Sequence, residues 1–300
     1  MAQSIWATFS NELAGAAADV GKSVVAVHGH RHPSSGILWS ADAVVTANHS
    51  VRRDEDLTVV TAPGQSTAAR VIGRDPTTDL AVLRLEQPAQ AGPARWGDAA
   101  KLRVGELVLA LGRTWRGNIV ASSGIISGLL GRWRTWRGGE LDQFIRPDLT
   151  LYSGFSGGPL VSAEGEILGL NTAGLHRSGL TIPASTVARV VTELLEKGKI
   201  ERPYLGLAMQ PVSLPESLRE RLNLIASEGL LIVHVESGSP AEKAGVLLGD
   251  VLIELEGKTL AETDVVQEAL RSRKIGDQIS LKLVRGGSPV TSSLTLAARP

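Results

Sequence analysis

The chain has 300 residues, of which 43% are hydrophobic and 21% charged, so it is long enough for two globular domains and does not have a disordered composition. Its 31 basic and 31 acidic residues cancel, which argues against a general nucleic-acid surface. The absence of cysteine excludes a disulfide, a thiolate nucleophile and a cysteine metal site. No apolar run reaches the roughly 18 residues that a membrane span needs.

The N-terminal segment predicts a short helix over residues 5–20. Ile5, Phe9, Leu13 and Ala16 recur at helical spacing, and Gly21 is expected to end the helix. The segment has no early basic residue and no continuous apolar core, so it does not read as a secretory signal. A cytoplasmic location is the expectation from the sequence as written.

From Val24 onward, short apolar runs rich in β-branched residues alternate with Gly, Pro, Asp and Ser. This texture predicts about ten short strands in an antiparallel all-β unit, either a sandwich or a barrel. The predicted strands are 24–27, 43–47, 57–62, 69–73, 80–85, 106–112, 119–128, 158–162, 166–174 and 180–183.

A helix follows this β unit and marks the end of the first domain. Ser185 is expected to cap its start, and Gly198 stands where a left-handed cap would end it. The polar segment after it ends in proline, which places a domain boundary near Glu201. The predicted organisation is therefore an N-terminal segment over 1–22, a first domain over 23–200 and a second over 201–300.

The second domain mixes helices and strands. Strands are predicted at 229–236 and 250–257, and a final hairpin at 279–287 and 291–298. Ser239, followed by proline and then by glutamate, predicts the capped start of a short helix. A second helix is expected to begin at Thr263, with Val265, Val266, Ala269 and Leu270 as its apolar residues.

One glycine-rich segment has the composition of a nucleophile turn. Ser156 lies in Gly154-Phe155-Ser156-Gly157-Gly158, where small residues expose the hydroxyl and let backbone N–H groups converge. A serine hydroxyl needs a base, and the base needs an orienting acceptor. His49, at the end of one β run, and Asp79, at the start of another, are the candidates for these two roles.

The blocks TANH, TDLAVL and GFSGGPL, in this order, resemble the three catalytic blocks of chymotrypsin-fold peptidases. In detail the chain resembles the HtrA/Deg branch, which the segments SSGIISG, FIRPDLTL, GEILGLNTA and LTIPAS also support. The resemblance covers roughly residues 20 to 300. It implies a mainly β fold, with a chymotrypsin-like double β-barrel followed by a small α+β PDZ domain.

The resemblance implies a serine endopeptidase that hydrolyses unfolded or damaged proteins through an acyl-enzyme, without a cofactor. Ser156 is then the nucleophile, His49 the general base and then acid, and Asp79 the residue that orients the imidazole. The backbone N–H groups of Gly154 and Ser156 are implied to form the oxyanion hole. Because His49 must be neutral to act as a base, activity is expected to rise with pH.

Several residues beside the proposed nucleophile and beside the proposed base depart from the family pattern. Phe155 and Tyr152 stand where the family commonly has asparagine, and Ser50 replaces the usual valine after the histidine. These departures leave a second hypothesis open. In it the chain is a catalytically dormant PDZ-containing protein that binds peptides or acts as a chaperone.

The resemblance also locates a specificity pocket, with Thr150, Leu151 and Leu180 among its residues. Thr150 occupies the position that carries an aspartate in enzymes selecting Arg or Lys. Because no acid is present there and the two leucines are apolar, we expect a preference for small or medium aliphatic residues before the cleaved bond.

In the second domain, Tyr204-Leu205-Gly206-Leu207 resembles the carboxylate-binding loop of PDZ domains. Backbone N–H groups of such a loop capture the C-terminal carboxylate of a peptide, and the adjacent strand edge accepts an added strand. The apolar residues of the helix beginning at Thr263 are expected either to line this groove or to belong to the core.

Three weaker signals remain. His28, His30 and His32 alternate, which is compatible with zinc, although a strand end or loop is the favoured interpretation and no metal site is assigned. Arg132, Trp133, Arg134, Trp136 and Arg137 form a basic–aromatic run, interpreted as a surface loop with a regulatory role rather than as a nucleic-acid site.

The aromatic residues Trp6 and Phe9 resemble oligomer contacts of the family, so a homo-oligomer is expected, with a trimer favoured. Family resemblance also implies a periplasmic or other extracytoplasmic location if a leader has been removed. This expectation conflicts with the cytoplasmic one, and the sequence leaves both open.

Overall fold

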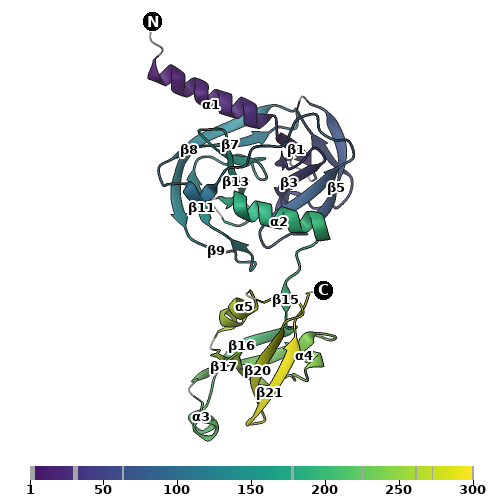
Figure 1. The fold of residues 1–300 in the computed structure, drawn as a ribbon, viewed down its shortest axis with the longest axis vertical. Coiled ribbons are helices and arrows are strands. Elements are labelled where there is room, and N and C mark those ends of the chain that lie inside the picture. Colours follow the sequence, from purple (N-terminus) through teal and green to yellow (C-terminus); the bar gives the residue numbers. More distant parts are fainter. Residues whose placement is uncertain are drawn as a thin grey trace. The chain divides into compact units, whose positions relative to one another are not determined.

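The computed structural model describes residues 4–29, 33–62, 64–176, 179–224, 226–260, 262–271 and 273–298. The chain divides into two compact units, Met1–Ile200 and Glu201–Pro300. Figure 1 shows the ribbon of each unit. Among the described residues, no helix has both the length and the apolar character needed to cross a bilayer.

The first barrel of the N-terminal unit is closed by six antiparallel strands in the order β1-β2-β3-β6-β5-β4. Branched aliphatic side chains of these strands are fully buried inside it, among them Val25, Leu38 and Leu83. Its strands are β1 (Val24–His28), β2 (Ser34–Leu38), β3 (Ala43–Ala47), β4 (Leu57–Val60), β5 (Ser66–Asp75) and β6 (Leu80–Leu85).

The second barrel is also closed by six antiparallel strands, in the order β11-β14-β13-β12-β7-β8. Its strands are β7 (Leu107–Arg113), β8 (Ile119–Leu130), β11 (Phe144–Asp148), β12 (Pro159–Ser162), β13 (Ile167–Thr172) and β14 (Leu180–Pro183). A small hairpin, β9 (Trp133–Arg134) and β10 (Glu140–Leu141), lies between β8 and β11 in the chain. The expected mainly β fold with two barrels is therefore confirmed.

Two helices accompany the barrels. The helix α2 (Ala184–Lys197) buries Val187, Val190 and Leu194 and packs against β5 and β6 of the first barrel and β13 and β14 of the second (Figure 1). Gly198 ends it with a φ of 73°, as predicted, but the N-cap is Pro183. The prediction of Ser185 as the cap was wrong, because the chain enters the helix directly from β14.

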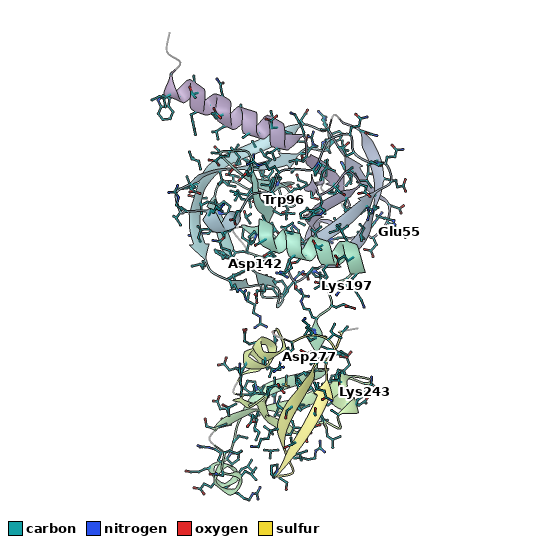
Figure 2. The ribbon with its side chains drawn as sticks, viewed as in Figure 1. Glu55, Trp96, Asp142, Lys197, Lys243 and Asp277 are labelled. Carbon is teal, nitrogen blue, oxygen red and sulfur yellow. The ribbon has the colours of Figure 1, made fainter. Side chains whose placement is uncertain are left out.

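The N-terminal helix α1 (Ile5–Gly21) ends at the predicted glycine and packs against β7. Figure 2 shows the side chains of the unit, with Trp96 toward its middle and Glu55 and Lys197 on its surface. The rings of Trp39 and Trp96 lie 5.3 Å apart and contact a core shared by both barrels. This shared core holds the two barrels together as one unit.

The C-terminal unit is built on a sheet in the order β16-β17-β18-β20-β21, with β19 paired to β18. Val266, Leu281 and Leu283 are among its fully buried core residues. The elements are β15 (Pro203–Tyr204), β16 (Leu207–Ser213), α3 (Glu216–Leu222), β17 (Glu228–Val235), α4 (Pro240–Lys243), β18 (Val251–Leu255), β19 (Lys258–Thr259), α5 (Thr263–Arg271), β20 (Gln278–Arg285), β21 (Ser288–Thr295) and β22 (Ala297–Ala298).

Candidate active site

The register of two strands brings His49 and Asp79 together. Ala47, the last residue of β3, pairs with Leu80, the first residue of β6. Because the strands are antiparallel, the residues that follow β3 and precede β6 must lie side by side. His49 follows β3 in a single 3₁₀ turn, Asn48–Ser50, and its backbone N–H donates to Asp79 Oδ1 over 2.8 Å.

The side chains of this pair are also in contact. His49 Nδ1 lies 2.7 Å from Asp79 Oδ2. The aspartate side chain is 2% exposed and the histidine 34%, so the acceptor is buried while the ring reaches solvent. Thr172 donates its hydroxyl to the same carboxylate oxygen, and Gly174 lies against both members of the pair. The buried carboxylate therefore has donors on several sides, which fixes the imidazole orientation.

Asp79 has a φ of 60°, in the left-handed region that non-glycine residues rarely adopt. The backbone is held there by the hydrogen bond from Asn48 N–H to the Asp79 carbonyl, 2.9 Å long. This conformation lets one residue present both its carbonyl and its carboxylate to the turn that carries His49. Strain of this kind is often retained where a side chain must be aimed at a site.

Ser156 lies on a turn of the second barrel between β11 and β12. The glycines on either side of the Phe155–Ser156 pair have positive φ, 96° at Gly154 and 87° at Gly157. The turn is fixed to β13 and its C-terminal extension, because Gly157 N–H donates to the Asn171 carbonyl over 2.8 Å and Ala173 N–H lies 3.3 Å from Ser156 Oγ. Among the described residues, no hydrogen bond joins the Ser156 hydroxyl to the His49 ring.

The two predicted oxyanion donors are unpaired. Within the described part of the chain, neither the Gly154 N–H nor the Ser156 N–H has an acceptor. The peptide between Gly154 and Phe155 is held at both ends, because Ser35 Oγ donates to the Gly154 carbonyl over 2.7 Å and Phe155 N–H donates to the Tyr152 carbonyl over 3.0 Å.

The unusual Phe155 is 1% exposed. It occupies space left by Gly112 on β7, where an added Cβ would lie 2.6 Å from the phenylalanine ring. The ring also meets Tyr152 edge-on, with centroids 5.6 Å apart. The side chain is therefore packed into the barrel wall.

The predicted pocket residues lie in different environments. Thr150 is exposed, and Leu151 is half-buried against Gly179, where an added Cβ would lie 2.5 Å from Leu151 Cδ1. Leu180 is fully buried in the core shared by the barrels. Their role in specificity stays a prediction.

The predicted carboxylate-binding loop connects β15 to β16. Tyr204 is the last residue of β15, Leu205 is buried, and Gly206 has a φ of 81°. In the described structure the N–H groups of Leu205 and Gly206 have no acceptor. Leu207 begins β16, the edge strand of the sheet, and α5 packs against it.

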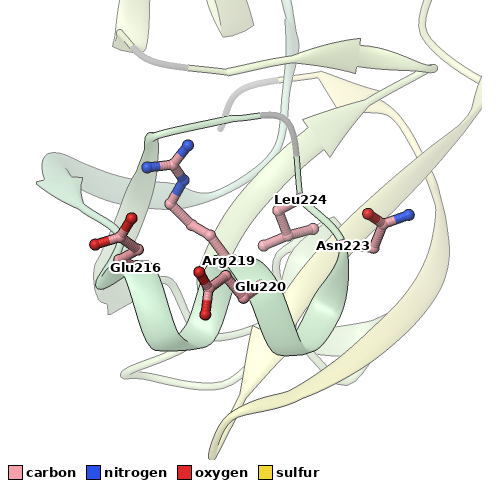
Figure 3. A pocket seen from close by; sticks show the side chains of 5 residues that line it. All are labelled: Glu216, Arg219, Glu220, Asn223 and Leu224. Atoms are coloured by element: carbon pink, nitrogen blue, oxygen red, sulfur yellow. The ribbon is translucent and has the colours of Figure 1, made fainter.

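A separate hollow lies beside α3 in the same unit (Figure 3). It is lined by Glu216, Arg219, Glu220, Asn223 and Leu224. None of these residues was predicted to bind peptide, and we assign the hollow no role.

The structure describes part of the histidine trio at 28, 30 and 32 and all of the basic–aromatic run at 132–137. Burial lowers the pKa of His28, while His30 and His32 lie outside the described residues. The basic–aromatic run covers β9 and part of the turn that leads to β10, and Thr135 within it donates its hydroxyl to the Thr77 carbonyl over 2.7 Å. Sequence reasoning did not identify Thr172 or Ser35, because an isolated Thr or Ser in a strand carries no recognisable signal.

Comparisons with known proteins agree with this architecture. Residues 34–170 match the trypsin-like peptidase domain family, and residues 203–296 match the PDZ domain family. The fold and these matches define a trypsin-like peptidase domain followed by a PDZ domain.

The relatives narrow this class. The chain is 34% identical to "Serine protease Do-like HtrB" of Bacillus subtilis, an alignment that covers 87% of this chain and 61% of that protein. It is also 34% identical to "Probable periplasmic serine endoprotease DegP-like" of Brucella suis, covering 91% of this chain and 54% of that protein. The chain thus spans between half and two thirds of these relatives.

Solved structures give the same result. The "HtrA-type protease AlgW with decapeptide" is 25% identical with a TM-score of 0.72, and the alignment covers 96% of this chain and 98% of that one. The same protease with a tripeptide is 27% identical with a TM-score of 0.68, covering 96% and 97%. The chain is therefore HtrA-like, with a trypsin-like peptidase domain followed by a PDZ domain.

Proposed function

We propose that this chain is a serine endopeptidase in which Ser156 is the nucleophile, His49 the general base and Asp79 the residue that orients the imidazole. The observation that carries the proposal is the 2.7 Å contact between His49 Nδ1 and the buried Asp79 carboxylate. A carboxylate on Nδ1 leaves Nε2 unprotonated in the neutral ring, which is the form that accepts a serine proton.

In the proposed reaction, Ser156 Oγ attacks the carbonyl carbon of the scissile bond and its proton passes to His49 Nε2. The carbonyl oxygen becomes an oxyanion that accepts hydrogen bonds from the N–H groups of Gly154 and Ser156. The intermediate collapses, and the amine leaves with the proton from His49. Water then attacks the acyl-enzyme by the same steps and releases the new carboxyl terminus.

The unpaired state of the two donors supports this assignment. Both residues are partly exposed, and within the described part of the chain neither N–H has an acceptor, so both can donate to the oxyanion of a bound substrate. Removing one such donor typically costs about 10²–10³ in rate, so the conformation of residues 154–156 matters as much as the triad.

We propose that the substrates are unfolded or damaged proteins cleaved after small or medium aliphatic residues. Thr150, Leu151 and Leu180 are the proposed pocket residues, and the absence of an acid among them supports an aliphatic preference. Cleavage of a peptide library checks this, and a profile dominated by Arg or Lys would contradict it.

We propose that the PDZ domain binds the C-terminus of a peptide at Tyr204–Leu207 and regulates the protease. The unpaired N–H groups of Leu205 and Gly206 support carboxylate binding, and the edge position of β16 supports strand addition beside α5. The peptide complexes of the AlgW protease support peptide binding in general.

We also make proposals about the domain boundaries, the oligomeric assembly and the cellular location of the protein. We propose a protease domain over 23–200, a PDZ domain over 201–300 and an oligomer contact within 1–22. The 79% exposure of Trp6 supports such a contact, with a trimer as the expected assembly. The word "periplasmic" in the name of the Brucella relative supports an extracytoplasmic location.

The decisive experiment is casein degradation by the wild-type chain beside Ser156→Ala, with and without a peptide that ends in an apolar residue. We expect cleavage by the wild type, none by the variant, and stimulation by the peptide. No cleavage by either protein, with the peptide still bound, would favour the dormant peptide-binding alternative.

A further inference from the structure

The strand β2 of the first barrel passes against the nucleophile turn of the second, and Ser35 lies at the point of contact. Ser35 exposes none of its surface. Its backbone N–H donates to the Ser156 carbonyl over 3.0 Å, and its hydroxyl donates to the Gly154 carbonyl over 2.7 Å. One residue of the first barrel therefore bonds the carbonyls of the same two residues, Gly154 and Ser156, whose N–H groups are the proposed oxyanion donors.

The hydroxyl of Ser35 is itself oriented. The Arg113 backbone N–H donates to Ser35 Oγ over 3.0 Å, and Thr46 donates its hydroxyl to the Ser35 carbonyl over 2.6 Å. Because the N–H of Arg113 occupies an acceptor position of the oxygen, the single hydroxyl proton is left for the Gly154 carbonyl. The Ser35 hydroxyl thus links β7 to the turn, because it accepts from Arg113 and donates to Gly154.

A fixed donor matters here because glycine does not fix its own conformation. Gly154 has a φ of 96°, and without a Cβ it reaches several other conformations at little cost. Rotation of the peptide between Gly154 and Phe155 would turn the Gly154 carbonyl away from Ser35 and change the directions of the neighbouring N–H groups. The hydrogen bond from Ser35 selects one of these conformations.

We propose that Ser35 is a positioning residue for the oxyanion hole. Its hydroxyl holds the 154–156 backbone so that the N–H groups of Gly154 and Ser156 face the charge that develops in the transition state. This role rests on the proposed endopeptidase function and adds to it a residue that does not touch the substrate.

The chain offers a matched control in the neighbouring residue. Ser34 is also in β2 and is 4% exposed, but its buried hydroxyl has no hydrogen-bond partner among the residues that the structure describes. Ser34→Ala and Ser35→Ala each remove one hydroxyl group, from two adjacent buried positions. Only the second substitution releases the Gly154 carbonyl.

The test compares these variants in the full chain, with Ser156→Ala as the blank. The quantities are kcat and KM for a peptide substrate, and the inhibition constant of a peptide boronate whose tetrahedral adduct places an oxygen in the oxyanion hole. Because losing one donor typically costs about 10²–10³, we expect Ser35→Ala to lower kcat by roughly 10–100-fold. KM should change little, boronate affinity should fall in parallel with kcat, and Ser34→Ala should resemble the wild type.

Four results would overturn the proposal. Wild-type kcat in Ser35→Ala, or a lower kcat with unchanged boronate affinity, refutes the positioning role alone. A wild type with neither turnover nor a boronate adduct refutes the proposed endopeptidase and, with it, this role. If Ser35→Ala does not fold, Ser35→Cys replaces the hydroxyl by a thiol, which is a much weaker donor, so kcat and boronate affinity should still fall together. A wild-type kcat in that variant would refute the role too.

Discussion

A methyl group added at Gly174 should separate the two residues that we propose as base and orienting acid. A Cβ at this position would lie 2.6 Å from His49 Nδ1 and 2.6 Å from Asp79 Oδ2. Ordinary contacts of a Cβ begin at 3.4 Å, so one or both groups must move by about 0.8 Å. Gly174 is not among the positive-φ residues, so its backbone conformation does not by itself disfavour alanine.

The expected loss follows from the geometry of the pair. Asp79 is buried and held by Thr172, so the displacement falls mainly on the more exposed imidazole. A misplacement of about 1 Å in a catalytic group costs on the order of 10²-fold in rate. Gly174→Ala should therefore lower kcat/KM for a peptide substrate by roughly 10²-fold, while the peptide affinity of the PDZ domain stays unchanged.

The matched control is Gly92→Ala, because nothing lies within 4 Å of the Cβ added there and its φ is not positive. Both variants are assayed for hydrolysis of one fluorogenic peptide, and their melting temperatures are compared with the wild type. Full activity of Gly174→Ala would refute the argument, since the His49–Asp79 contact could then be lengthened without consequence. A loss in both variants would show that the effect does not come from the pair.

Two further predictions concern the PDZ domain. Gly206→Ala puts a Cβ 2.1 Å from Ser239 Cβ, at a residue whose φ is 81°. Binding of a C-terminal peptide, measured by fluorescence anisotropy, should weaken at least 10-fold, while basal peptide hydrolysis persists. Wild-type peptide affinity in this variant would contradict the prediction. Burial opposes ionisation of Asp250, but hydrogen bonds from Arg285 and the Leu247 N–H outweigh it and lower the pKa of Asp250 below its ordinary value. Asp250→Asn should therefore lower the free energy of unfolding, measured in urea at pH 7, by about 1–3 kcal/mol. The difference should be smaller at pH 3, because the stabilisation by the ionised carboxylate is present above its ordinary pKa and is lost as the pH falls. An equal difference at both pH values would contradict this prediction.

The antiparallel all-β character followed from the sequence because its strongest strands are continuous apolar runs, whereas the double barrel was implied by the family resemblance. The predicted runs at 43–47 and 80–85 are the strands β3 and β6 with the same bounds. The caps at Gly198 and Ser239 were also predictable, since each depends on one local residue. Local chemistry and hydrophobic pattern were sufficient for these elements.

Two strands that close the barrels were not predicted from periodicity. The strand β2 begins with Ser34, Ser35 and Gly36, which have weak strand propensity. The strand β11 contains Pro147 and a register shift beside it. Both are strands because their neighbours in the barrel supply the hydrogen-bond partners, and long-range pairing of this kind is invisible in a single sequence window.

The same limit applies to the candidate site. The roles proposed for His49, Asp79 and Ser156 came from motifs, which carry strong local signals. The contacts of Ser35 and Thr172 depend on the approach of two barrels and on strand register. Sequence reasoning therefore reaches the residues proposed to act on the substrate and misses those that hold them in place.

The departure at Phe155 shows how a family motif can change beside a nucleophile. The ring needs space, and Gly112 supplies it, because any side chain there would meet the ring at 2.6 Å. One way for Phe155 to make the site dormant is to collapse the turn, so that its N–H groups find acceptors within the chain. Among the described residues the N–H groups of Gly154 and Ser156 have none, so packing of the ring against Gly112 leaves the proposed donors available for an oxyanion.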